Sequence, residues 1–328
     1  MRDQRIDFMK GMLMWCVVYG HTINAFFSGI AHTPIWLHTF VRTFDMPFFM
    51  MLSGFFLRKS LAKRRAIDVF VNRLSMILVP IVVWTLLLAR VDIFNRYYFL
   101  WAVLCSGFTC IAGHALTSYL PSRIMRVLEC LLYIGVVVFF HAFRVPWNMF
   151  YLFPFFVVGY YLRDVNYGKK LASIMAVVFI AGLCFWNADY TPWKIGALAW
   201  RDNAAAFLVY GFRFVLGISG VCAMGIVFDS IRRLCGEESF FVRVVVGWGR
   251  ETLALYILQT LCVEIALRLL CEQFWRHCAI SPSGAIMNLI GYLIVPALSF
   301  FLVVLLSMVV KRVKSTRLGK YAFGFKVM

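Results

Sequence analysis

Long apolar runs separated by short polar stretches are the main pattern of this chain. An α-helix needs about 20 mostly apolar residues to cross a bilayer, and most of the runs have that length. The pattern predicts an all-α polytopic membrane protein with about ten transmembrane helices, built as one integral-membrane domain over residues 1–328. The ten runs are residues 8–27, 36–57, 69–90, 97–117, 125–142, 149–162, 171–187, 204–230, 248–270 and 284–310.

Basic residues collect in alternate loops between these runs. The head of the chain, the loop 58–73 and the tail from Lys311 onward are the richest in Lys and Arg. Because cytoplasmic loops carry the excess of Lys and Arg, both termini are expected to be cytoplasmic, with an even number of spans. The formal net charge of +18 is therefore attributed to basic loops that set the orientation of the chain in membrane lipid. No nucleic-acid partner is expected.

Composition supports the same class. The chain is 62% hydrophobic and only 15% charged, which leaves no room for a large soluble domain. Most of the 10 cysteines lie inside apolar runs and show no metal-ligand spacing, so they are interpreted as small buried hydrophobic residues. No metal site is expected.

The first run carries a stripe of polar residues. Lys10 and His21 are eleven residues apart, which on an α-helix is about three turns, roughly 16 Å of rise and an offset of about 20°. Asp7 and Asn24 fall within about 60° of the same line. A lone intramembrane histidine is well explained by a hydrogen bond to a neighbouring helix. A histidine in line with a lysine and an aspartate favours a functional site.

The second and third runs add three charged residues. Arg42 and Asp45 are three apart, so they share a helix face and can pair, as a structural ion pair or as part of a site. Asp45 lies toward the same outer half as His21, where a carboxylate would fix the tautomer of the imidazole. Arg73 starts the third run, at a depth suited to phosphates or lipid headgroups.

Later runs hold further ionisable residues. Glu264 and Arg268 are four apart and are expected to pair with each other. Arg213 has no partner nearby in the sequence, so a partner on another helix is expected. Trp101 is interpreted either as a packing residue or as a stacking surface.

Several of these residues stand in motifs. The segment Arg5-Ile6-Asp7-x-x-Lys10-Gly11, followed by His21, resembles the membrane acyltransferase 3 family, and within it the branch of fucose 4-O-acetylases and related acetyltransferases. Further segments similar to that family occur in order along nearly the whole chain. They are Met46-Pro47 with Ser53-Gly54, Arg73 through Pro80 and Trp84, Tyr98 to Trp101, Phe153 to Gly159, and Leu253 to Tyr256.

The chain also departs from that family's pattern at four positions. Lys10 replaces the commoner arginine, a change that loses bidentate contact with phosphate. Asp45 stands where the branch often has histidine before Met-Pro, and Met76 stands where many members have a second arginine. Gln259 stands where a histidine often closes the segment that begins at Tyr256.

The resemblance implies transfer of an acyl group, usually acetyl, from coenzyme A to a sugar hydroxyl. The acceptor would be a cell-envelope polysaccharide or its lipid-linked precursor at the bacterial inner (cytoplasmic) membrane. His21 is expected to be the general base, oriented by Asp45 or Asp7, with an acyl-histidine intermediate as a variant. Acetyl-CoA is expected to bind Lys10, Arg5, Arg73 and Arg65. The acceptor is expected to bind Asn24, Arg42, Ser53, Trp101 and Tyr256.

Two other classes fit a polytopic chain of this kind. A proton-coupled secondary transporter that exports a glycoconjugate would also use buried Arg, Glu, Asp and His. The sequence lacks matching broken helices in two halves, and its polar residues concentrate in the first two runs. A structural or signalling membrane protein is the third class. Consumption of acetyl-CoA separates the enzyme from the transporter, and the third class predicts no phenotype when His21 is changed at normal protein abundance.

Overall fold

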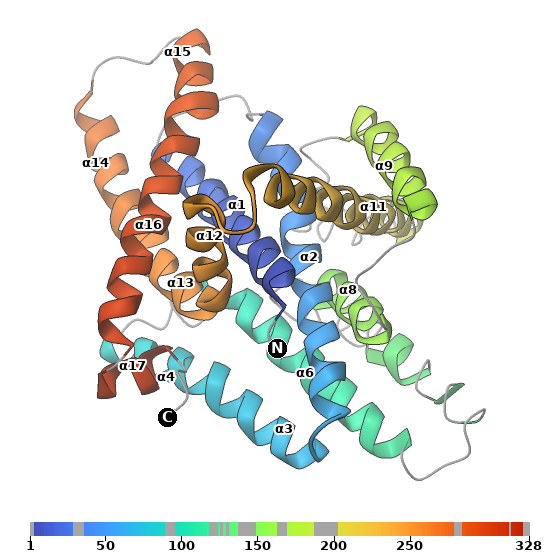
Figure 1. Ribbon diagram of the computed structural model, residues 1–328. Helices are drawn as coiled ribbons and strands as arrows, with labels where there is room; N and C mark the ends of the chain where they lie inside the picture. The colour runs from blue at the N-terminus through green and yellow to red at the C-terminus, as the bar shows by residue number, and fades with distance from the viewer. Residues whose placement is uncertain are drawn as a thin grey trace. The chain divides into compact units, whose positions relative to one another are not determined.

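All secondary-structure elements in the described part of the chain are helical (Figure 1). The computed structural model describes residues 3–28, 36–88, 96–117, 124, 127–128, 131–136, 149–162, 169–186, 203–278, 284–314 and 316–323. Two compact units are present. Unit 1 comprises Met1–Asp45, Ala172–Ala188 and Ser219–Met328, and unit 2 comprises Met46–Leu171 and Asp189–Ile218.

Six helices within the described residues are long and apolar enough to cross a membrane. They are Trp36–Leu61, Ala66–Leu87, Tyr98–Ala115, Leu208–Cys235, Thr252–His277 and Gly284–Val313. Each coincides with one of the ten apolar runs of the sequence, so the chain is a multi-pass membrane protein. The first helix, with its polar stripe, is not among the six, and most of the run 125–142 lies outside the described residues. The total of about ten spans and the cytoplasmic termini stay predictions.

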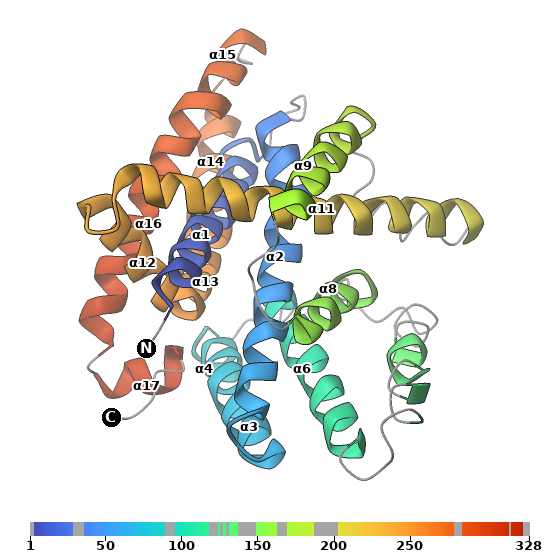
Figure 2. The same cartoon turned by 45° about the vertical axis from the view of Figure 1, so that its right-hand side comes forward.

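Helix α1 (Gln4–Phe26) begins at a side-chain cap and runs unbroken for 23 residues. The carboxylate of Asp3 accepts hydrogen bonds from the backbone N–H groups of Arg5 (3.0 Å) and Ile6 (3.4 Å), which the first helical turn leaves unpaired. Most of its apolar side chains are buried. In both views α1 lies among the helices of the C-terminal part of unit 1 (Figures 1 and 2). It is the central helix of that unit.

Helix α12 (Phe240–Arg250) packs against α1 through two glycines that allow the backbones to touch. A β-carbon on Gly11 would lie 2.0 Å from the carbonyl oxygen of Val245, and one on Gly249 would lie 1.7 Å from that of Asp7. Any larger residue would force the helices apart, because backbone atoms cannot rotate out of the way. The Lys10-Gly11 motif is thus also a packing motif.

The remaining helices of unit 1 form two long rods beside α1. One rod is continuous through α13 (Thr252–Gln259), η2 (Thr260–Leu267) and α14 (Arg268–His277). The other is continuous through α15 (Gly284–Leu289), η3 (Ile290–Ile294) and α16 (Val295–Val313), and α17 (Arg317–Phe323) follows it. The indole N–H of Trp15 donates to Ser299 Oγ at 3.0 Å and so fixes α1 to α16.

The apolar run 248–270 was expected to be one span, and this boundary was wrong. Helix α12 ends at Arg250, and α13 begins a new helix at Thr252 after Glu251, whose backbone (φ −119°, ψ 20°) is not helical. The span therefore covers Thr252–His277. Apolar residues continue on both sides of the break, so hydropathy alone does not reveal it.

Unit 2 is built around the crossing of α2 (Trp36–Leu61) and α8 (Met149–Tyr161). A β-carbon on Gly54 would lie 2.0 Å from the carbonyl oxygen of Phe156, and one on Gly159 would lie 1.9 Å from that of Met51. The other elements of unit 2 are α3 (Ala66–Arg73), η1 (Leu74–Leu78), α4 (Val79–Leu87), α6 (Tyr98–Thr117) and the first half of α11 (Asn203–Cys235). Unit 1 contains the start of α2, the second half of α11 and most of α9 (Lys169–Cys184).

Three of the long spans contain a π-helical segment. Two of these segments, η1 and η3, end just before a proline at the start of the next helix, Pro80 and Pro296. Proline has no N–H and its ring clashes with the carbonyl four residues earlier, which favours the wider turn. The third segment, η2, contains no proline, and it holds residues of the candidate site.

Candidate functional site

The imidazole of His21 faces a carboxylate from another helix. Its Nδ1 lies 3.2 Å from Glu264 Oε1, which belongs to η2. Both side chains are largely enclosed, with 13% and 15% of their surfaces exposed. A carboxylate at Nδ1 fixes that nitrogen as the protonated one and makes Nε2 the basic nitrogen. It also stabilises the positive charge that imidazole gains when it takes up a proton.

Glu264 is held in turn by polar groups of its own helix. The amide nitrogen of Gln259 donates to Glu264 Oε1 at 3.0 Å, and the Thr260 hydroxyl lies 3.3 Å from the same oxygen. Gln259 and Thr260 are both fully buried. In an α-helix residues five apart point about 140° away from each other, but a π-helix bonds residue i to residue i+5 and brings them together. The π-helical turn therefore creates this cluster.

One of the two expected carboxylate partners of His21 stands elsewhere. Asp7 lies 14 residues earlier on the unbroken helix α1, about 21 Å along its axis, and cannot orient the imidazole. Asp45 is buried and lies close enough to Cys16 to act on it electrostatically, and its catalytic role stays a prediction. Glu264 was expected to pair with Arg268. Arg268 instead binds Glu272 at 2.8 Å, because the π-helical turn shifts Glu264 toward α1.

A second imidazole approaches the same part of α1. The His38 ring lies 3.7 Å from the position that a β-carbon of Gly20 would take, which is an ordinary van der Waals distance. Arg42 Nε donates to His38 Nε2 at 3.1 Å. Arg42 was expected to pair with Asp45, but its described partner is His38, one helical turn away. His38 was not expected in the site.

Two predicted acceptor-binding residues flank this cluster. Asn24 is exposed near the end of α1, three residues after His21. Tyr256 is buried one turn before Thr260, whose hydroxyl donates to its carbonyl oxygen at 3.1 Å. Both lie in unit 1 with His21. Their role toward an acceptor stays a prediction.

The N-terminal half of the polar stripe is occupied by ion pairs. The buried carboxylate of Asp7 lies 3.8 Å from Lys10 Nζ and 3.5 Å from Arg250 Nε. The charges of Asp7 and Lys10 therefore balance within the protein, and Arg250, which is half exposed, adds a positive charge at the surface. The stripe is thus two separate polar sites on one helix.

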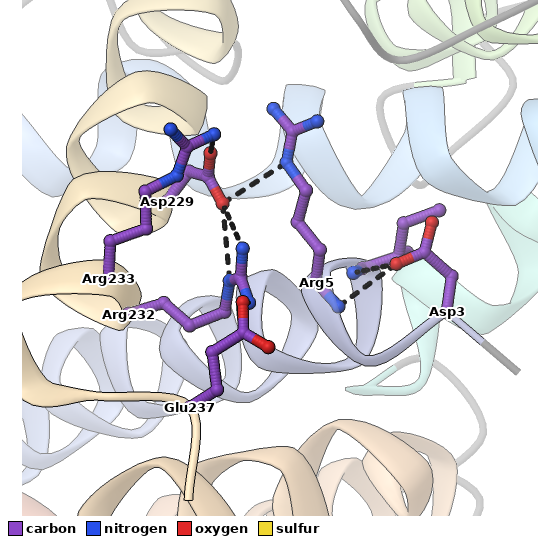
Figure 3. Close-up of polar contacts among 7 residues, drawn as sticks. Asp3, Arg5, Asp229, Arg232, Arg233 and Glu237 are labelled. Carbon is purple, nitrogen blue, oxygen red and sulfur yellow. Dashed lines mark hydrogen bonds and ion pairs between the residues drawn. The ribbon is translucent and has the colours of Figure 1, made fainter.

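Arg5 belongs to a cluster of arginines around a single buried carboxylate (Figure 3). Asp229 lies 3.2 Å from Arg5 Nε, 3.0 Å from Arg232 Nη2 and 2.8 Å from Arg233 Nη2. Arg232 also pairs with Glu237. We call Arg5, Arg232, Arg233 and Asp229 the arginine cluster. Three guanidinium groups face two carboxylates, and the Arg233 side chain is 69% exposed.

Unit 2 brings two other predicted residues together. Arg73 Nη2 donates to the carbonyl oxygen of Ser53 at 3.1 Å, and the guanidinium lies 5.7 Å from the ring centre of Phe156. Gly107 makes room for it, since a β-carbon there would lie 2.9 Å from Arg73 Nη1. Three of the quoted motifs therefore meet at Arg73. Ser53 takes part through its backbone.

The other predicted residues of unit 2 have surroundings of their own. Arg65 is exposed and binds Asp68, three residues on, at 3.1 Å. Trp101 is partly buried near the start of α6. Arg213 is buried, and its guanidinium lies 4.7 Å from the ring centre of Tyr151, so its partner is on another helix as expected. The binding roles of Arg65 and Trp101 stay predictions.

Sequence reasoning missed the contacts made by Glu264, Gln259 and Asp229. The useful signal for Glu264 and Asp229 is that a carboxylate within an apolar span needs a specific partner. Gln259 was noticed as a departure from the family pattern, but its contact with Glu264 depends on the π-helical turn. No periodicity rule for an α-helix predicts that contact.

Comparison with known proteins agrees with the motifs. A family model described as an acyltransferase domain matches residues 3–115. The nodulation protein NolL of Sinorhizobium fredii is 24% identical over 290 residues, which cover 79% of this chain and 77% of that protein. NolL of Mesorhizobium japonicum is 23% identical over 291 residues, covering 79% and 76%. No solved structure matches the chain.

The matched region contains His21, Arg73 and both motifs of the first two helices. Six apolar helices long enough to span a bilayer accompany it. The predicted resemblance to the membrane acyltransferase 3 family is borne out over residues 3–115, and together these comparisons support an acyltransferase.

Proposed function

We propose that this enzyme moves an acetyl group from acetyl-CoA to a hydroxyl of a cell-envelope sugar, with His21 as the general base. The acceptor is a polysaccharide or its lipid-linked precursor, and the enzyme works in the bacterial inner membrane. The observation that carries the proposal is the contact between His21 Nδ1 and Glu264 Oε1 at 3.2 Å. Proton transfer of this kind contributes about 10²–10⁴-fold to a rate.

The proposed step uses the pair as follows. His21 Nε2 takes the proton from the acceptor hydroxyl, and the oxygen attacks the thioester carbonyl carbon of the donor. The new C–O bond forms as the C–S bond breaks, and the proton passes from Nε2 to the departing thiolate. Glu264 keeps Nδ1 protonated throughout and stabilises the imidazolium in between. The products are the acetyl ester and free coenzyme A.

The arginine cluster suits the donor's phosphates. Coenzyme A is polyanionic, and arginine presents planar N–H donors that match phosphate oxygens. Asp229 fixes three guanidinium groups side by side, and each has further N–H groups beyond those that it uses on Asp229. Arg5 was predicted to bind the donor, and we add Arg232 and Arg233 to it.

The other predicted donor residues have different surroundings. Lys10 forms an ion pair with Asp7, so its contribution to phosphate binding is indirect. Arg73 has its guanidinium fixed by Ser53 and Phe156, and planar donors on its remaining edge suit a phosphate or a carbonyl oxygen. Arg65 is exposed and suits only long-range attraction of an anion.

The test compares surface glycans of a deletion strain that carries wild type, His21→Ala or His277→Ala. His277 is an exposed histidine at the end of α14 and serves as the matched control. Ester-linked acetate, measured by NMR, should be lost only with His21→Ala at equal protein abundance. Full acetylation by His21→Ala would overturn the general-base role. Acetate unchanged by the deletion itself would favour the exporter, which consumes no acetyl-CoA.

A further inference from the structure

We propose that Gln259 is a positioning residue, whose side-chain amide holds Glu264 in the orientation that fixes His21. This inference rests on the proposed function of His21. Gln259 is 0% exposed, and its Nε2 lies 3.0 Å from Glu264 Oε1 and 3.0 Å from Thr260 Oγ1. It touches the partner of the base and acts through it.

The other end of the same amide makes no hydrogen bond to any described residue. Gln259 Oε1 is buried, and an unmatched buried acceptor is destabilising. Turning the amide over would place that acceptor against the carboxylate of Glu264, so two acceptors would face each other. The carboxylate therefore sets the orientation of the amide. An apolar side chain of the same length would fill the space without any unmatched acceptor, so packing alone does not account for glutamine here.

Thr260 cannot replace the amide as a donor to Glu264. Its single hydroxyl proton has two acceptors within reach, the carbonyl oxygen of Tyr256 at 3.1 Å and Glu264 Oε1 at 3.3 Å. While the hydroxyl bonds to Tyr256, it cannot donate to the carboxylate. Gln259 has two N–H groups and can serve Glu264 and Thr260 together. Among the described donors of this helix, the Gln259 amide is therefore the one that can donate to Glu264 at all times.

Loss of the amide should loosen the base. Without its Gln259 contact, the Glu264 carboxylate can rotate about its last torsion, and Nδ1 of His21 loses a fixed acceptor. The imidazole then distributes its proton between Nδ1 and Nε2, and the molecules protonated on Nε2 cannot act as a base there. The expected fall in acetylation rate is about ten- to a hundredfold, by analogy with the loss seen when outer partners of metal-binding histidines are removed.

The experiment measures the His21 tautomer directly, by ¹⁵N NMR of the full chain labelled at histidine. The His21 signals among the 6 histidines are identified from the His21→Ala spectrum. In wild type they should report a protonated Nδ1. In Gln259→Met they should report a mixture, with a parallel fall in ester-linked acetate on the surface glycan. Thr22→Val is the control, because among the described residues its buried hydroxyl bonds only its own helix, at Val18.

The outcomes separate this inference from the proposed function. A His21 tautomer that is unchanged in Gln259→Met overturns the positioning role, whatever happens to acetylation. A protonated Nε2 in wild type overturns it without any variant, which covers the case that Gln259→Met fails to fold. If Gln259→Met changes the tautomer while His21→Ala still acetylates, the positioning role stands and the general-base role fails.

Discussion

His21 Nδ1 and Glu264 Oε1 lie 3.2 Å apart and join α1 to the π-helical turn η2. The two residues come from opposite ends of the chain, so neither half of the protein contains the pair by itself. If the chemistry depends on the pair, changing the carboxylate should resemble changing the base.

Glu264→Gln should lower acetylation by about 10²–10⁴-fold while the protein stays in the membrane. The amide keeps the shape of the side chain but removes the charge that stabilises the imidazolium and selects its tautomer. Ester-linked acetate per molecule of enzyme is the measurement. Glu272→Gln is the matched control on the next turns of the same rod, since Glu272 binds Arg268 and Ser28. Equal acetylation by both variants would show that Glu264 has no role in catalysis.

Gly249→Ala should destabilise unit 1 by about 1–3 kcal/mol or more. The new β-carbon would lie 1.7 Å from the Asp7 carbonyl oxygen, so α12 must move away from α1. Thermal unfolding of the purified protein in detergent gives the measurement. Gly247→Ala, two residues earlier on the same helix, meets nothing within 4 Å. It should leave stability unchanged or raise it by up to about 1 kcal/mol through helix propensity.

Asp229→Asn should cost about 3–5 kcal/mol of stability, because three arginines lose the buried charge that holds them together. It should also weaken binding of acetyl-CoA, since the guanidinium groups would separate. Thermal unfolding and the KM for acetyl-CoA are the two measurements. Glu237→Gln is the control, as its side chain is 63% exposed and contacts only Arg232 of the cluster. A fall in stability with an unchanged KM would leave the cluster a purely structural role.

Arg73→Lys should raise the KM for acetyl-CoA and leave the enzyme folded. Lysine keeps the charge but lacks the planar fork that reaches Ser53 and stacks on Phe156. The control is Arg65→Lys, at a side chain that is 82% exposed, where the same exchange should have no effect. An effect on stability without any change in KM would assign Arg73 to packing.

Much of the architecture is predictable from hydropathy. Six of the ten predicted apolar runs coincide with helices of spanning length, because burial in a bilayer demands long uninterrupted apolar segments. The break at Glu251 was not predicted, since apolar residues continue on both sides of it. Hydropathy reports how apolar a segment is. It does not depend on backbone conformation, so it cannot reveal the non-helical backbone at Glu251.

The site was predictable only in part, for a related reason. His21 stands out because an ionisable residue within an apolar helix needs an explanation. Its partner Glu264 was assigned to Arg268 by the four-residue spacing of an α-helix, and the π-helical turn removes that spacing. Pairings that join distant parts of a chain depend on tertiary packing. Local rules supply the candidates and leave the choice among them open.

The π-helical segment Thr260–Leu267 gives chain length a direct influence on chemistry. A π-helical turn holds one more residue than an α-helical turn, so the loss of a single codon between Thr260 and Glu264 would restore the tighter winding. The glutamate would then follow Gln259 by four residues, a spacing that places both side chains on one face of an α-helix. Tighter winding without that deletion would instead turn Glu264 about 140° away from Gln259. The contact between these two side chains therefore depends jointly on the winding of this segment and on its number of residues.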